Sequence, residues 1–255
     1  MKKVLFTALC ICLMSAAGPA QNRDAASIIK DANNPLATIK AASIHNVYSP
    51  AVYGAYGSNN TLWLRYAQPV WRFLIRASLP VNSVNIGNID KSGLGDLNVF
   101  GTFILTQPAS KYQFGVGPIL TIPTGTSSVL GSGKWQIGAA FAAYFSKSPT
   151  LQIGLLATWQ FSFAGKSSRN DVHVATIQPF FMWQLGKGLY MRSSAINMLD
   201  FENGHYLVPM GLGIGKIVKV NRLVFNLFAE PQFTLWHKGS GLPKTQLFIG
   251  INTQF

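Results

Sequence analysis

The chain has 255 residues, of which 48% are hydrophobic and only 11% are charged, and its formal net charge is +13. Charged residues usually make up about 25% of a soluble domain, so this chain is poorly suited to an ordinary soluble fold. Its Lys and Arg residues form no clustered stripe, which argues against nucleic-acid binding. Beyond residue 20, no apolar run approaches the roughly 20 residues that a transmembrane helix needs. A lipid-compatible chain without spanning helices is expected to form a closed barrel.

The first twenty residues have the pattern of a secretory signal peptide. Two lysines precede an apolar run over residues 4–14, and small residues follow over residues 15–20. The run is too short to span a membrane, so we predict a cleavable signal peptide at residues 1–20. Both cysteines lie within it, which leaves the mature chain without a disulfide or a cysteine metal site. Residues 21–35 are polar and are predicted to be a periplasmic lead-in.

Apolar and polar residues alternate along residues 36–255, which are predicted to form one barrel domain. In residues 151–163, every second residue is apolar, and the residues between them are mostly polar or small. Alternation of this kind predicts strands with one lipid-facing side and one inward side. The predicted strands are residues 36–48, 60–70, 71–82, 94–107, 111–123, 134–146, 150–164, 172–186, 188–199, 204–219, 222–236 and 245–255.

The predicted connections alternate between tight turns and longer segments rich in Gly, Ser, Asn and Asp. The tight turns are expected near residues 70, 107–111, 146–150, 185–188 and 220–221. The longer connections are residues 49–60, 83–93, 124–133, 165–171, 200–203 and 237–244. Short periplasmic turns and longer outer loops are typical of outer-membrane barrels. We therefore predict an all-β, antiparallel transmembrane β-barrel of about twelve strands, with both ends in the periplasm.

Aromatic residues lie at positions that suit such a barrel. Five tryptophans are predicted near strand ends, as expected for interfacial girdles: Trp71, Trp135, Trp159, Trp183 and Trp236. The strand predicted at residues 245–255 ends on Phe255 and resembles the strand that bacterial outer-membrane proteins present to their insertion machinery. We therefore predict that Phe255 is an assembly signal. An ordinary half-buried antiparallel strand is the alternative.

Five charged residues are predicted to face the lumen. Strand parity places them there: Arg65, Arg76, Asp96, Arg192 and Glu230. Charge inside a narrow barrel is costly unless it is paired or hydrated, so we expect Arg76, Asp96 and Glu230 to meet opposite charges. Such residues either select a solute at a constriction or brace the barrel through salt bridges, and the two roles are compatible.

Patterns that indicate enzyme or cofactor chemistry are weak. Gly211, Gly213 and Gly215 have glycine spacing similar to a dinucleotide loop, but no helix is predicted after them, and they are interpreted as small inward residues. The four histidines lack metal-ligand spacing, and no serine-centred nucleophile elbow is present. We therefore predict no enzyme activity, no metal and no cofactor.

Several short motifs, taken together, resemble a known family. They are GLGD at 93–96, GVGP at 115–118, PTGT at 123–126, LGSGKWQIG at 130–138, WQFSFAG at 159–165 and VPMGLGIGK at 208–216. The chain is similar in these motifs to the outer-membrane β-barrel family of transporters resembling the MetA-pathway phenol-degradation proteins. The resemblance covers residues 34–236 and departs at His45, where the family more often has Gln before Asn. It implies an outer-membrane barrel and, more loosely, passage of a small organic solute.

The combined prediction is a monomeric channel or transporter in the bacterial outer membrane, with hydrophobic and aromatic molecules as candidate solutes. Its expected partners are outer-membrane lipids, the barrel insertion machinery and the solute, and not nucleic acid. Two alternatives stay open. One is a structural or loop-binding barrel with a closed lumen, and the other is a lipid-modifying barrel enzyme.

Overall fold

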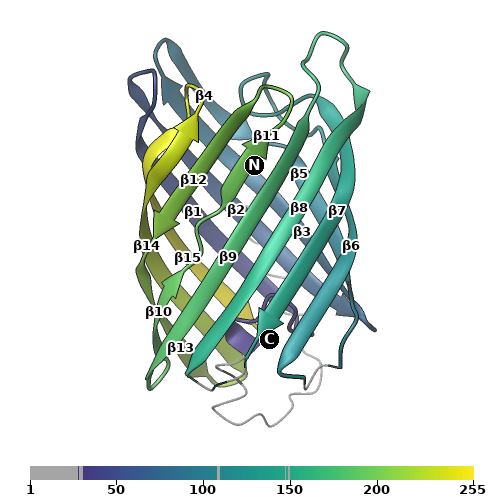
Figure 1. Ribbon diagram of the computed structural model, residues 1–255, viewed down its shortest axis with the longest axis vertical. Coiled ribbons are helices and arrows are strands. Elements are labelled where there is room, and N and C mark those ends of the chain that lie inside the picture. Colours follow the sequence, from purple (N-terminus) through teal and green to yellow (C-terminus); the bar gives the residue numbers. More distant parts are fainter. Residues whose placement is uncertain (1–27, 29–30, 108–109, 147, 149) are drawn as a thin grey trace, which may run out of the picture.

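The computed structural model describes residue 28 and residues 31–107, 110–146, 148 and 150–255, so the predicted signal peptide lies outside the described part. The described chain forms one antiparallel sheet that closes on itself as a twelve-stranded barrel (Figure 1). Closure is made by β1 (Ala41–Val52) and β15 (Pro243–Gln254), which pair along their length. Closure leaves no free sheet edge and confirms the all-β barrel that the alternation predicts.

Nine of the barrel strands are uninterrupted, and three are divided into two segments each. Besides β1 and β15, the uninterrupted strands are β2 (Gly57–Val70), β3 (Phe73–Ile86), β6 (Tyr112–Ile122), β7 (Lys134–Phe145), β8 (Leu151–Gly165), β9 (His173–Gly186) and β14 (Leu223–Lys238). The divided strands are β4 (Ile89–Leu94) with β5 (Leu97–Ile104), β10 (Leu189–Ser193) with β11 (Asn197–Asp200), and β12 (His205–Gly211) with β13 (Gly213–Val220). Each half of a divided strand pairs with the same neighbour, which is β3, β9 or β14 respectively.

The two ends of the barrel differ in their connections. At one end, called the turn end, short links such as residues 71–72, 187–188 and 221–222 join the strands. Each of these three links has a non-glycine residue at positive φ, as two-residue hairpins require. At the opposite end, called the loop end, the longest connections are residues 123–133 and 166–172. The predicted alternation of tight and longer connections is present, although several of the longer ones are shorter than expected.

Two predicted boundaries differ clearly from the structure. The first strand begins at Ala41 rather than at residue 36, because Leu36 is buried and precedes the barrel wall. The predicted loop 83–93 is instead a hairpin, in which β3 and β4 pair from Val81 opposite Leu94 to Ile86 opposite Ile89. Its polar residues can form a ladder because this hairpin needs no apolar face in lipid.

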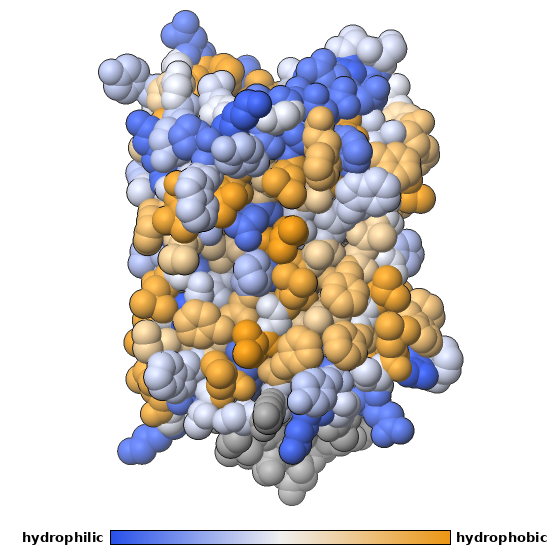
Figure 2. All heavy atoms as spheres, viewed as in Figure 1, coloured by the Kyte–Doolittle hydropathy of each residue, from blue (hydrophilic) through white to orange (hydrophobic). Residues whose placement is uncertain are grey.

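The outer face of the barrel is apolar. Many large hydrophobic side chains are exposed on every side, and Figure 2 shows them gathered over the middle and lower parts of the visible face. Hydrophilic side chains gather toward the upper end of the same view. Trp71, Trp183 and Trp236 are more than half exposed, as expected for interfacial aromatic residues. Within the described residues, no helix has the length and apolarity to cross a membrane.

A short segment before β1 enters the barrel at the turn end. It begins with a helical turn at Asp31 and Ala32, and side chains from three strands bind it. Asn226 Nδ2 of β14 donates to Ala32 O at 3.0 Å, and Gln254 Nε2 of β15 donates to Asp31 O at 3.0 Å. On β6, Gln113 Oε1 accepts from Asn34 Nδ2 at 2.8 Å. These contacts place part of the predicted periplasmic lead-in inside the lumen.

Apolar side chains complete this closure of the turn end. Ile28 and Leu36 are nearly inaccessible to solvent. Ile28 packs in a buried cluster whose other members come from the barrel wall: Tyr144, Phe180, Met182, Tyr190, Ile217 and Val224. The turn-end part of the lumen is therefore a packed core, since side chains can fill the interior of a barrel of this small diameter.

Candidate solute site in the barrel lumen

Glu230 is a fully buried carboxylate on β14, and four donors surround it. Arg192 Nε donates to Oε2 at 2.8 Å, while Ser194 donates from its backbone N to Oε1 and from its Oγ to Oε2, both at 2.8 Å. Gln232 Nε2 donates to Oε1 at 2.9 Å. The Arg192 guanidinium also lies 3.6 Å from the centroid of the Phe228 ring. Both charges are compensated, so this group braces the wall between β10 and β14.

The same carboxylate explains the break between β10 and β11 and the glycines opposite it. The Ser194 N–H is bound by Glu230, so the strand is interrupted at this residue. A Cβ at Gly211 or Gly213 would lie 2.7 Å or less from atoms of Glu230 or its neighbours. A Cβ at Gly215 would lie 2.2 Å from the ring of the buried Tyr190. The interpretation of these glycines as small inward residues is confirmed.

Arg65 and His45 form a second polar group on the wall of β1 and β2. Arg65 Nη1 lies 2.8 Å from His45 Nδ1, and His45 Nε2 lies 2.7 Å from Asn252 Oδ1. Because a guanidinium can only donate, Nδ1 must accept, and the imidazole is neutral with its proton on Nε2. The Arg65 guanidinium also lies 4.9 Å from the centroid of the Trp63 ring. His45 therefore orients Arg65 without neutralising it.

Arg76 lies next to Arg65 on the inward face. In the ladder of β2 and β3, Arg65 is opposite Ser78 and Ala67 is opposite Arg76, so the two arginines are diagonal neighbours. The Arg76 guanidinium stacks 4.2 Å from the centroid of the Phe100 ring. Its Nε and that of Arg65 are buried without a hydrogen-bond partner. Neither arginine has a carboxylate within salt-bridge distance among the described residues.

The expected opposite charges are thus found for only one of three residues. Within the described residues, the ion pairs are Arg192 with Glu230 and Lys134 with Asp171. Glu230 meets an opposite charge as predicted, whereas the prediction was wrong for Arg76 and for Asp96. Arg76 has no carboxylate within salt-bridge distance among the described residues, and Glu230 is already bound by Arg192, Ser194 and Gln232.

Asp96 has a different role from the one that strand parity suggests. It lies between β4 and β5, where the strand is interrupted, and it lines the lumen cavity at the loop end. Its Oδ1 accepts from Gly125 N at 3.0 Å, and its Oδ2 accepts from Ser132 N and Ser132 Oγ at 2.7 Å each. Asp96 therefore anchors the connection between β6 and β7 at the loop end.

A cavity of about 340 Å³ lies in the loop-end half of the lumen. Two pairs from the β2–β3 ladder, Thr61 with Asn82 and Trp63 with Pro80, form one of its walls. The next pair toward the turn end is Arg65 with Ser78. The other lining residues come from β7, from the β6–β7 connection and from nearby strand ends: Asp96, Thr121, Val129, Leu130, Gly131, Ser132 and Gln136. The cavity therefore ends close to the arginine pair.

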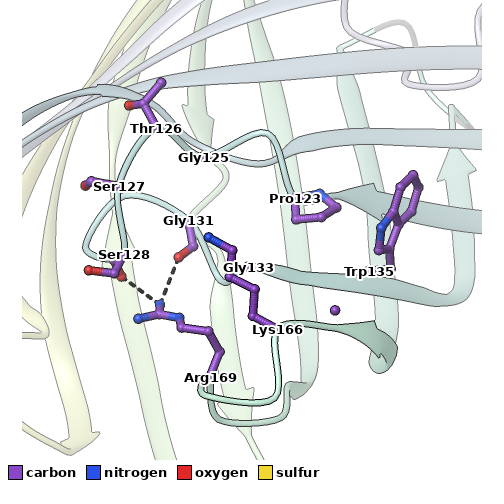
Figure 3. Close-up of a pocket in the computed structure, with 11 residues that line it drawn as sticks. Pro123, Gly125, Thr126, Ser127, Ser128, Gly131, Gly133, Trp135, Lys166 and Arg169 are labelled. Carbon is purple, nitrogen blue, oxygen red and sulfur yellow. Dashed lines mark hydrogen bonds between the residues drawn. The ribbon is translucent and has the colours of Figure 1, made fainter.

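A second cavity of about 380 Å³ lies at the loop-end rim, between the β6–β7 and β8–β9 connections. Figure 3 shows Arg169 reaching across it, where Nη2 donates to Ser128 O at 2.6 Å and to Gly131 O at 2.9 Å. Beside it, the hydrogen bond from Lys134 holds the pKa of Asp171 below its ordinary value. These contacts tie the two connections together at the loop end.

Arg65, Arg76, Arg192 and Glu230 lie on the inward face and Asp96 lines the lumen cavity, whereas a role of these residues at a constriction stays a prediction. Their neighbours were missed. His45 and Trp63 follow the same parity as Arg65 and could have been found with it. The N-terminal segment gave no signal, because a short polar stretch has no periodicity. Among the described residues, no three His, Cys, Asp or Glu side chains are grouped so that they could hold a metal ion.

No protein-family model and no curated protein matches the sequence. Solved structures do match. An outer membrane channel from Pseudomonas putida F1 has a TM-score of 0.67 at 13% identity, over 87% of this chain and 97% of that one. The NanC porin has a TM-score of 0.54 at 10% identity, covering 84% and 98%. The KdgM porin, in complex with disordered oligogalacturonate, has a TM-score of 0.51 at 8% identity, covering 84% and 99%. The chain therefore has the fold of outer-membrane channels and porins.

Proposed function

We propose that the protein is a channel or transporter of the bacterial outer membrane that passes a small solute through its lumen. One observation carries the proposal: a closed barrel with an apolar outer face encloses a cavity that ends near two half-buried arginines, whose Nε atoms have no hydrogen-bond partner. A lumen with polar side chains inside an apolar wall is typical of a membrane-spanning channel, and in this structure the packed core at the turn end closes one end of that lumen. The fold shared with outer-membrane channels supports this location, and no step of the proposal needs catalysis.

We further propose that the solute is a small hydrophobic or aromatic molecule. Trp63, Pro80, Val129 and Leu130 give the cavity apolar surface, which suits a small hydrophobic or aromatic molecule. The resemblance of the short motifs to the family of MetA-pathway phenol-degradation proteins supports the same class of solute. We further propose a monomer, because the outer face is apolar on all sides and suits contact with lipid.

Planar-bilayer recordings of the wild type and of Arg76→Ala test the channel. The wild type should conduct, and the variant should shift toward cations, because a fixed positive charge leaves the lumen. Reversal potentials in a KCl gradient measure this shift. Arg222→Ala, which removes a cation from an exposed turn, is the matched control and should leave selectivity unchanged. A conducting variant with wild-type selectivity would remove Arg76 from the conduction path.

The closed structural barrel is the second candidate, and two observations favour it. The N-terminal segment is bound to three strands at the turn end, and the group around Glu230 braces the wall. If the wild type does not conduct ions under any of these conditions, the structural role is the better account. A lipid-modifying activity has no grouped Ser, His and acid side chains to support it among the contacts described above.

A further inference from the structure

Arg65 and Arg76 are two positive charges that lie side by side in the lumen without a counter-charge. The Nε atoms of both are buried and unpartnered, and the Arg76 guanidinium lies over the Phe100 ring. Both residues are half-buried, so their charges are only partly hydrated, and two adjacent cations also repel each other. The fold nevertheless holds both in place, through His45 and Trp63 for Arg65 and through Phe100 for Arg76.

No carboxylate of the described chain is positioned to relieve this charge. Glu230 is saturated by Arg192, Ser194 and Gln232, and Asp96 is occupied by the β6–β7 connection. A neutral His45 adds no negative charge. An anion that arrives from outside the chain is therefore the group that could compensate the two guanidiniums.

We propose that Arg65 and Arg76 bind the carboxylate of a small organic acid whose apolar body lies in the adjoining cavity. The inference deepens the proposed channel function by naming the class of solute. Guanidinium groups present a planar fork of donors that matches a carboxylate in a bidentate way. From the arginines toward the loop end, the ladder continues with Trp63 opposite Pro80, so the body of the acid meets an aromatic ring and a proline.

The geometry also distinguishes this site from the other arginine of the lumen. Arg192 already has its carboxylate, at 2.8 Å, and its guanidinium is covered by Phe228. It therefore offers no free fork to a solute. Specificity follows from the pair alone: a neutral molecule of the same shape would leave both charges unpaired and would bind more weakly.

Calorimetric titration of the purified, detergent-solubilised protein with benzoate tests the inference, with benzyl alcohol as the neutral counterpart. Benzoate should bind the wild type at least about tenfold more tightly than benzyl alcohol does, because only its carboxylate forms charge-assisted hydrogen bonds with the arginines. Arg76→Gln should weaken benzoate binding about ten- to a hundredfold and leave benzyl alcohol unaffected. Added KCl should weaken benzoate binding, since chloride competes for the same charge.

Two controls keep the result interpretable. Arg222→Gln makes the same change of charge at an exposed turn and should bind benzoate like the wild type. If Arg76→Gln does not fold, as judged by loss of heat-modifiability, Arg76→Lys keeps the charge and loses the fork, and it should bind more weakly than the wild type. Equal binding of benzoate and benzyl alcohol, or full binding by the arginine variant, would overturn the inference.

Conductance separates this inference from the proposed function. If the protein binds benzoate as described but does not conduct, the carboxylate site stands and the channel function is refuted. If the wild type conducts but binds benzoate no more tightly than benzyl alcohol, and no more tightly than Arg76→Gln does, the channel function stands and the carboxylate site is refuted.

Discussion

At the scale of single residues, the charged side chains of the lumen fall into two groups, one paired within the chain and one without a counter-charge. Glu230 and Arg192 are neutralised within the chain, with four donors on one carboxylate and an aromatic ring against the guanidinium. Arg65 and Arg76 are positioned by aromatic rings and by His45 but are left positive. The first arrangement serves the wall, and the second leaves binding capacity that only an external group can use.

Replacing Glu230 with Leu should strongly destabilise the barrel. The change leaves Arg192 as a buried charge without a partner, for which the cost is about 3–5 kcal/mol. The temperature at which the folded form converts to the unfolded form on gels should fall clearly. Adding Arg192→Leu should restore part of the loss, and Glu202→Leu, at an exposed connection, should have little effect. A single variant as stable as the wild type would show that the pair is not a brace.

At the scale of elements, period two was sufficient to locate nearly every strand, because a barrel wall needs an apolar and a polar face throughout its length. It failed where a residue does not belong to the wall. Asp96 interrupts the wall between β4 and β5, and although it lines the lumen cavity as parity predicts, parity could not show that the β6–β7 connection would bind it. The segment before β1 is ordered by partners on β6, β14 and β15, and no local pattern can reveal partners so distant in sequence.

Asn34→Ala should loosen that segment and make the lumen more permeable. Asn34 donates to Gln113 on β6 at 2.8 Å, and its Oδ1 accepts from Leu36 N at 2.9 Å, so it fixes both the position and the shape of the segment. The conductance of the variant in planar bilayers should be higher and more variable than that of the wild type. Asn203→Ala, at an exposed connection of the loop end, is the control with the same chemical change. An unchanged conductance would show that passage does not depend on how firmly this segment is held.

At the scale of the whole molecule, closure of the sheet is what makes strands of alternating polarity compatible with lipid. The pairs of β15 with β1 and with β14 satisfy its backbone on both sides, so no edge is left to meet lipid. These pairs end at Gln254, which lies opposite Ala41 on one side and Val224 on the other. Phe255 follows the last pair and adds one backbone hydrogen bond, from its N to Lys40 O at 3.2 Å.

Deleting Phe255 should therefore impair assembly far more than it impairs the finished barrel. The wild type should fractionate with the outer membrane and be heat-modifiable on gels, since a closed barrel resists unfolding by detergent until it is heated. The truncated protein should reach the membrane at a reduced level, because we propose that the insertion machinery reads the aromatic residue after the closing strand. Refolded from denaturant into detergent, however, it should unfold at nearly the same temperature as the wild type, because no ladder pair of β15 is lost.

Gln254→Ala is the informative comparison, since it keeps Phe255 but removes the hydrogen bond from Gln254 Nε2 to Asp31 O at 3.0 Å. Wild-type membrane levels for the truncated protein would show that Phe255 is not the signal, and a large fall in its unfolding temperature would show that its role is structural.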